Sequence, residues 1–95
     1  MTTANKAVRL RDAATAGRTG DVTALLADRV PVDAADDLGD TALIKAVRAD
    51  QPEVAVLLRR HGASLDLKNH AGETARTIAA SVGDAALDKA LGLSG

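Results

Sequence analysis

Four aspartates in one short polar segment are the residues whose type and spacing most suggest chemistry. Asp33, Asp36, Asp37 and Asp40 lie within residues 30–44, a stretch without Lys or Arg. Clustered carboxylates could bind Ca²⁺, which takes about six to eight oxygen ligands, or could contact a basic partner. The spacing does not match a calcium-binding EF-hand loop, and short polar side chains often hydrogen-bond their own turn. We therefore expect Asp33 and Asp36 to hold turns, and Asp37 and Asp40 to remain free charges.

The other side chains capable of catalysis do not form a constellation. His61 and His70 belong to different predicted elements, and no third ligand type clusters with either one. Surface histidines are therefore favoured over a zinc site or a catalytic triad. The serines have no neighbouring base in the sequence, and the glycine-rich patterns that bind phosphate groups are absent. We predict that the chain is not an enzyme and that it uses no cofactor or metal.

Composition restricts the class of protein further. The 95 residues are 46% apolar without one aromatic side chain, and 12 basic and 13 acidic residues give a net charge of −1. This balance lacks the basic footprint of a nucleic-acid-binding protein, and no ring is available to stack on a base. The absence of cysteine excludes disulfides and thiolate chemistry. No apolar run resembles a signal peptide or approaches the roughly 20 residues of a membrane span, so we expect a cytoplasmic protein without a membrane partner.

Apolar residues recur at the spacing of one helix face in several short blocks. Five clear blocks and a weaker one around Ile78 predict six short helices in three antiparallel pairs. The clear blocks are Leu10/Ala13/Ala14, Val22/Leu25/Leu26, Leu43/Ala46/Val47, Val54/Leu57/Leu58 and Leu87/Ala90/Leu91. Boundary residues agree with this division, because Thr41, Thr74 and Asp84 can cap helix N-termini and Pro52 suits a first turn.

Several turns between these helices require a left-handed backbone. Gly17 and Gly83 stand between paired helices, and Gly62 follows the fourth helix. Asp50 and Arg29 occupy the equivalent places, where a Cβ atom makes the left-handed conformation costly. We expect these two turns to be strained or rebuilt.

A motif in the middle of the chain recurs one step of 33 residues later. Gly39-Asp40-Thr41-Ala42 corresponds at that distance to Gly72-Glu73-Thr74-Ala75. The same step joins Leu10 to Leu43, Ala13 to Ala46, Leu25 to Leu58 and Leu58 to Leu91. A 33-residue period with this pattern resembles the ankyrin repeat family over roughly residues 8–91. The resemblance implies an all-α repeat fold: a short ankyrin-type solenoid of three antiparallel helix pairs joined by β-hairpin-like loops.

The resemblance also implies one domain over residues 1–95, with repeats at about 5–36, 37–69 and 70–93. Two polar segments between helix pairs, residues 30–40 and 63–73, are named here the first finger and the second finger. The Thr-Pro-Leu-His tetrapeptide of the family is replaced by Thr41-Ala42-Leu43-Ile44 and by Thr74-Ala75-Arg76-Thr77. Both the proline turn and the bridging histidine are missing, which predicts less rigid fingers. A complete short array and a piece of a longer one are equally compatible with these features.

Proteins of this family bind partners through finger residues and the exposed end of the first, inner helix of each pair. Transferred position by position, the resemblance implies a partner-binding surface. Its members are Asp37, Leu38, Asp40, Lys45, Arg48, Ala49, His70 and Glu73. Leu38 at a fingertip has little to pack against, which favours an apolar anchor for a partner over a role in packing the turn.

We therefore predict a non-catalytic module that binds another protein through its fingers and the concave face of its inner helices. A monomer is favoured over a homodimer. The alternative is a self-associating structural unit, in which Leu87, Leu91 and Leu93 or the first helix pack against a second copy. The sequence does not specify the identity of the partner.

Overall fold

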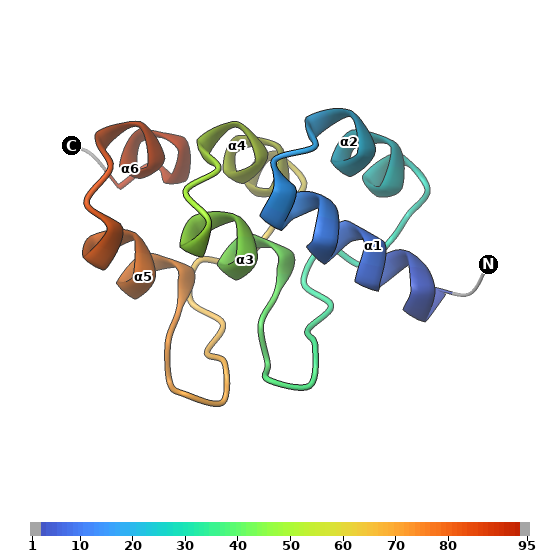
Figure 1. Cartoon of the computed structure of the whole chain (residues 1–95), viewed down its shortest axis with the longest axis horizontal. Coiled ribbons are helices and arrows are strands. Elements are labelled where there is room, and N and C mark those ends of the chain that lie inside the picture. The colour runs from blue at the N-terminus through green and yellow to red at the C-terminus, as the bar shows by residue number, and fades with distance from the viewer. Residues whose placement is uncertain (1–2, 94–95) are drawn as a thin grey trace.

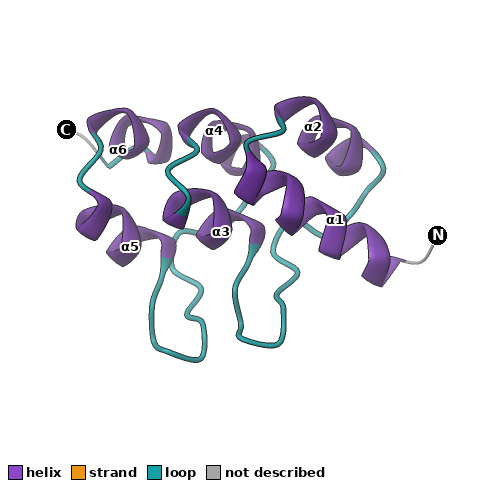
Figure 2. Cartoon of the chain, viewed as in Figure 1, coloured by secondary structure: helices purple, strands orange, loops and turns teal. Residues whose placement is uncertain are grey.

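The computed structural model describes residues 3–93, with side chains from residue 5 onward. Six helices and no strand occur in that range (Figure 2). The helices are α1 (Thr3–Ala16), α2 (Thr19–Ala27), α3 (Ala42–Arg48), α4 (Pro52–Arg60), α5 (Ala75–Val82) and α6 (Ala85–Leu91). The prediction of an all-helical chain with six helices is confirmed. The first two and last two residues of the predicted domain lie outside the described residues.

The helices form two layers (Figure 1). α1, α3 and α5 lie side by side in one layer, and α2, α4 and α6 in the other. Contacts join neighbours within each layer and also the two helices of each consecutive pair. Both fingers leave the layer of α1, α3 and α5 and extend in the same direction, away from the second layer. This arrangement places the finger residues beside the inner helices.

The core between the layers consists of aliphatic side chains and alanine. Its largest fully buried apolar members are Leu10, Leu43, Ile44, Leu58 and Leu87. Alanines 14, 42, 46, 55 and 79 have no exposed surface at all. Because alanine ends at Cβ, helices that meet through it can approach closely without voids, and a core without rings is thereby filled.

Burial also contradicts the part of the predicted self-association surface that lies at the C-terminal end. Leu87 and Leu91 are buried in the core, and Leu93 is half-buried against it. The interpretation of these leucines as an exposed apolar end is therefore wrong. They hold α6 to the rest of the chain.

The predicted N-caps are confirmed. The Thr41 hydroxyl accepts a hydrogen bond from the Ile44 amide at 3.2 Å, and the Thr74 hydroxyl accepts one from the Thr77 amide at 3.1 Å. A carboxylate oxygen of Asp84 caps α6 in the same way at 2.9 Å. Each cap satisfies an amide that has no partner inside its helix, so the starts of α3, α5 and α6 are set locally.

The predicted left-handed turns are confirmed as well. Asp50 has φ 56° and Arg29 has φ 62°, the conformation that Gly17, Gly83 and Gly62 adopt at the corresponding turns. The step of 33 residues therefore preserves the backbone geometry even where it does not preserve glycine. Each non-glycine residue costs about 1–2 kcal/mol in this region.

The first finger lies close to the second at Gly39, which yields a matched pair of tests. Gly39 and Gly72 have similar φ values of 81° and 79°. A Cβ on Gly39 would lie 2.9 Å from the Asn69 Cα, whereas one on Gly72 would meet open space. We expect Gly72→Ala to cost about 1–2 kcal/mol through its backbone alone. Gly39→Ala should cost a further ~1–3 kcal/mol through overpacking.

Urea denaturation of the two variants measures this difference. Equal midpoints would contradict the close contact between the fingers, because the two substitutions share the same backbone penalty and differ only in what the new methyl group meets.

Candidate functional site

Each fingertip is folded around one side-chain oxygen. In the first finger, Asp36 Oδ1 accepts hydrogen bonds from the amides of Leu38 and Asp40, both at 2.9 Å. In the second finger, Asn69 Oδ1 accepts from the amides of Ala71 and Glu73 at 3.0 and 2.9 Å. The predicted turn role of Asp36 is confirmed. Asn69 was not singled out from the sequence, although it lies one 33-residue step beyond Asp36.

Asp33 connects the two fingers instead of holding its own turn. Its Oδ1 accepts a hydrogen bond from the Ser64 amide at 3.1 Å, across 31 residues of sequence. The prediction of a local turn bond at Asp33 is therefore wrong. The bond depends on the packing of the second finger against the first, which brings the Ser64 amide to this carboxylate.

Asp40 is a buried, fully paired carboxylate. Only 2% of the residue is exposed. Arg48 donates to its two oxygens at 2.8 and 3.3 Å, Asn69 Nδ2 donates at 2.8 Å, and Lys45 Nζ lies 3.6 Å away. The hydrogen bonds from Arg48 lower the pKa of Asp40 to about 2, with Asn69 acting in the same direction and burial opposing them. The prediction that Asp40 remains a free charge is wrong.

The network extends from Asp40 to the second finger. Arg48 bridges Asp40 and Glu73, whose Oε1 lies 3.4 Å from Nη2. Asn69 Nδ2 also donates to Glu73 at 3.0 Å, and the His70 amide donates to the Leu38 carbonyl at 2.9 Å. These bonds hold one finger against the other.

Two further predicted surface residues are partly withdrawn from solvent. Lys45 is half-buried, and its ammonium group lies 3.2 Å from Asp36. Ala49 is also half-buried and terminates α3. Both adjoin the fingers, but neither presents a free functional group.

The remaining predicted residues face solvent around the fingertips. Leu38 is 64% exposed, and Asp37, His70, Arg48 and Glu73 are exposed as well. Leu38 separates two shallow depressions. The one toward the second finger is lined by Leu38, Asp40, Arg48, Asn69, His70, Ala71 and Glu73. The one toward α1 is lined by Val8, Arg11, Asp12, Ala35, Asp36, Asp37, Leu38 and Lys45.

Val8 is the member of this surface that the sequence did not reveal. It is 48% exposed, although it lies on α1 between the buried Ala7 and Leu10. Its pairing with the first finger depends on how α1 packs beside α3. No local pattern signals that proximity.

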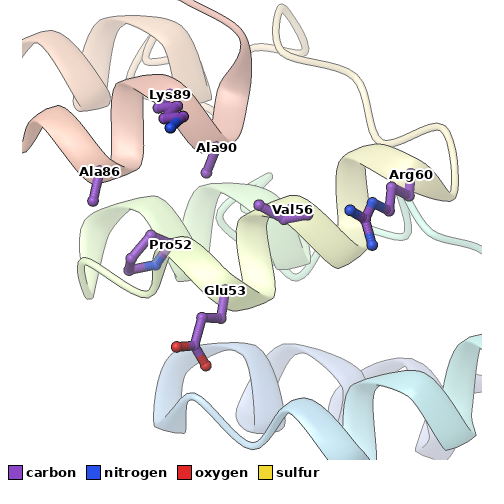
Figure 3. Close-up of a pocket in the computed structure, with 7 residues that line it drawn as sticks. All are labelled: Pro52, Glu53, Val56, Arg60, Ala86, Lys89 and Ala90. Atoms are coloured by element: carbon purple, nitrogen blue, oxygen red, sulfur yellow. The ribbon is translucent and has the colours of Figure 1, made fainter.

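The opposite layer carries an open groove between α4 and α6 (Figure 3). Pro52 and Val56 of α4 face Ala86 and Ala90 of α6, and Lys89 belongs to the same lining. Arg60 lies at the far end of α4, and the Glu53 side chain points away from α6. Small side chains on α6 leave this groove shallow, and it lies in the layer away from the fingers.

The side chains capable of metal binding or catalysis stay separate. No group of three or more His, Cys, Asp or Glu residues that could hold a metal ion occurs among the described residues. His61 lies at the end of α4 with Nδ1 2.9 Å from the Leu57 carbonyl. His70 lies in a different element, the second finger. Within residues 3–93, no helix has the length and apolar character needed to cross a membrane.

The segment that contains α3, α4 and the facing parts of both fingers corresponds to a known repeat. The family model of the ankyrin repeat matches residues 38–70. The chain therefore contains an ankyrin repeat over these residues, as expected for the ankyrin repeat family. No curated protein has a significantly similar sequence. Ankyrin repeats are in general protein–protein interaction modules and are typically non-catalytic, and in this ankyrin-repeat protein the matched segment begins and ends at two exposed fingertip residues, Leu38 and His70.

Proposed function

We propose that this ankyrin-repeat protein is a non-catalytic module that binds another protein through its fingers and the neighbouring face of α1, α3 and α5. We infer that the three helix pairs form a short ankyrin-type solenoid with hairpin-like fingers. We also infer that the protein is a cytoplasmic monomer. The observation that carries it is Leu38, a large apolar side chain held 64% exposed on a finger that is otherwise fixed by hydrogen bonds.

An exposed leucine on a rigid support is suited to binding. Burying such a side chain in a partner contributes about 1.5–3 kcal/mol, and a finger that is already ordered loses little entropy on association. Asp40 contributes to binding by holding the first finger in place rather than by contacting the partner. Asp37, His70, Arg48 and Glu73 remain as polar contact residues around Leu38.

Self-association through Leu87 and Leu91 is not retained as a second function. Both side chains are buried in the core. A second copy could not reach them without unfolding α6.

Site-specific photo-crosslinking tests the binding surface. We expect a photoreactive residue at position 38 to capture a partner from cells of the source organism. A photoreactive residue at Ala86, in the groove between α4 and α6, serves as the control. Capture at position 86 but not at 38 would overturn the proposed surface.

The captured partner then allows a matched substitution. Leu38→Ser should weaken its binding by at least tenfold, because an anchor of this size contributes about 1.5–3 kcal/mol. Leu67→Ser changes another exposed leucine, in the second finger, and should leave binding within about twofold because scattered surface leucines carry no binding energy. Equal affinities for the two variants would contradict the role of Leu38.

A further inference from the structure

The depression between α1 and the first finger has an apolar floor formed from two distant segments. Val8 of α1 is 48% exposed and Leu38 of the first finger 64% exposed, and Ala35 lies exposed in the same lining. Of the four large apolar side chains that are exposed in the described part of the chain, two therefore meet in one depression. A hydrophobic floor shared by two elements is typical of a site that receives an apolar side chain.

The rim of this depression is unevenly charged. Asp12 and Asp37 are exposed, and within the described residues neither side chain takes part in an ion pair or hydrogen bond. Two cations, Arg11 and Lys45, belong to the same lining. Arg11 donates to the Ala34 carbonyl at 3.0 Å, and Lys45 lies 3.2 Å from Asp36. Asp12, Asp36 and Asp37 outnumber these two cations, so the net charge of the lining is negative.

We propose that this depression binds a partner segment in which an aliphatic side chain is flanked by Lys or Arg. The proposal rests on the function proposed above and specifies its partner. The aliphatic side chain lies on Val8 and Leu38, and the flanking cations approach Asp12 and Asp37. An acidic segment would meet two unpaired carboxylates, so the rim selects against it.

The chain itself offers one competing occupant. Leu67 and Lys68 are adjacent and exposed in the second finger, and they have the chemistry that the depression requires. Insertion of this pair by a second copy would be a head-to-tail contact. It is one of the outcomes that the experiment below separates.

Selection from a random displayed-peptide library on the immobilised full chain tests the proposal. We expect the enriched peptides to place Leu, Ile, Val or Met next to Lys or Arg. The double variant Asp12→Asn/Asp37→Asn should bind a synthetic enriched peptide about fivefold more weakly, since exposed ion pairs are individually weak. Val8→Ser should weaken the same peptide to a similar or greater extent.

A matched variant controls for the loss of two carboxylates. Asp21→Asn/Glu53→Gln removes two exposed carboxylates from the first turns of α2 and α4, and it should leave the affinity for the peptide unchanged. Rising salt should reduce the affinity of the wild-type chain more than that of the Asp12/Asp37 double variant.

Each contrary result has a distinct meaning. Enriched peptides without basic residues, no enrichment at all, or equal affinity for the Asp12/Asp37 double variant would overturn the inference. The function proposed above would still stand if a partner cross-links at position 38 and loses affinity with Leu38→Ser. Sedimentation that shows wild-type oligomers dissociated by Leu67→Ser would instead assign the depression to a second copy and overturn the proposed partner.

Discussion

Replacing Asp40 with Asn should destabilise the fold by about 2 kcal/mol at neutral pH, measured by urea denaturation. The carboxylate is buried and its pKa falls from an ordinary value of 3.8 to about 2, a difference equivalent to ~2 kcal/mol of stabilisation. Asn retains the shape of the side chain but loses the charge that attracts Arg48 and Lys45. Its amide group would also point a donor toward the donors of Arg48 and Asn69.

Asp37→Asn is the matched control, because Asp37 has the same chemistry three residues earlier and is exposed without a partner in the described chain. It should change the free energy of unfolding by less than about 0.5 kcal/mol. Equal losses for the two variants would contradict the assignment of Asp40 as the buried member. A charge reversal at Asp40 would disturb folding, so any loss of binding could not be assigned to a lost contact. Of these two aspartates, only Asp37 is suited to binding experiments.

The effect of Asp40→Asn should depend on pH. Because the folded pKa is depressed, the carboxylate stabilises the fold fully above the unfolded value of 3.8 and loses this contribution as pH falls through about 2. The difference between wild type and variant should therefore be constant from pH 7 to about 5 and shrink to about half near pH 3. A stability difference between wild type and Asp40→Asn that grew toward low pH would contradict a lowered pKa of Asp40 in the folded state.

Leu58→Ala should lower the free energy of unfolding by about 2–5 kcal/mol. Leu58 has no exposed surface and lies in α4, which contacts α2, α3 and α6. Removal of its side chain leaves a cavity in the core, which the surrounding structure can only partly fill. In an array of this size, such a loss is a large share of the whole free energy of unfolding.

Leu38→Ala provides the comparison for the same chemical change on the surface. It should shift the unfolding midpoint by less than the equivalent of about 0.5 kcal/mol, because a 64% exposed side chain gains little from folding. Thermal and urea unfolding of both variants give the result. A Leu58→Ala melting curve that matched wild type would mean that the core lies elsewhere.

Much of the fold follows from local sequence. The spacing of apolar residues specifies the six helices, and Thr41, Thr74 and Asp84 start three of them through bonds within about three residues. The turn at Asp36 is equally local, since its oxygen serves amides two and four residues on. Such features can be predicted because every atom involved belongs to one short segment.

The candidate site could be predicted only in part. The exposure of Leu38 agrees with its place at a fingertip, but Val8 joins it only because α1 packs beside the first finger. The recurrence at 33 residues could have drawn attention to Asn69 as the counterpart of Asp36. Its second bond, to Asp40, has no counterpart in the first finger and depends on the neighbouring repeat.

By itself the sequence determined the repeat period, the helices, their caps and the segment that carries the fingers. Only the tertiary structure decided which of two aspartates in the same loop is exposed. Asp37 and Asp40 have the same side chain and the same polar surroundings in the sequence. Asp40 becomes buried because Asn69, 29 residues away, and Arg48 of α3 close around it, and the energy of that contact exists only when the two fingers are packed together.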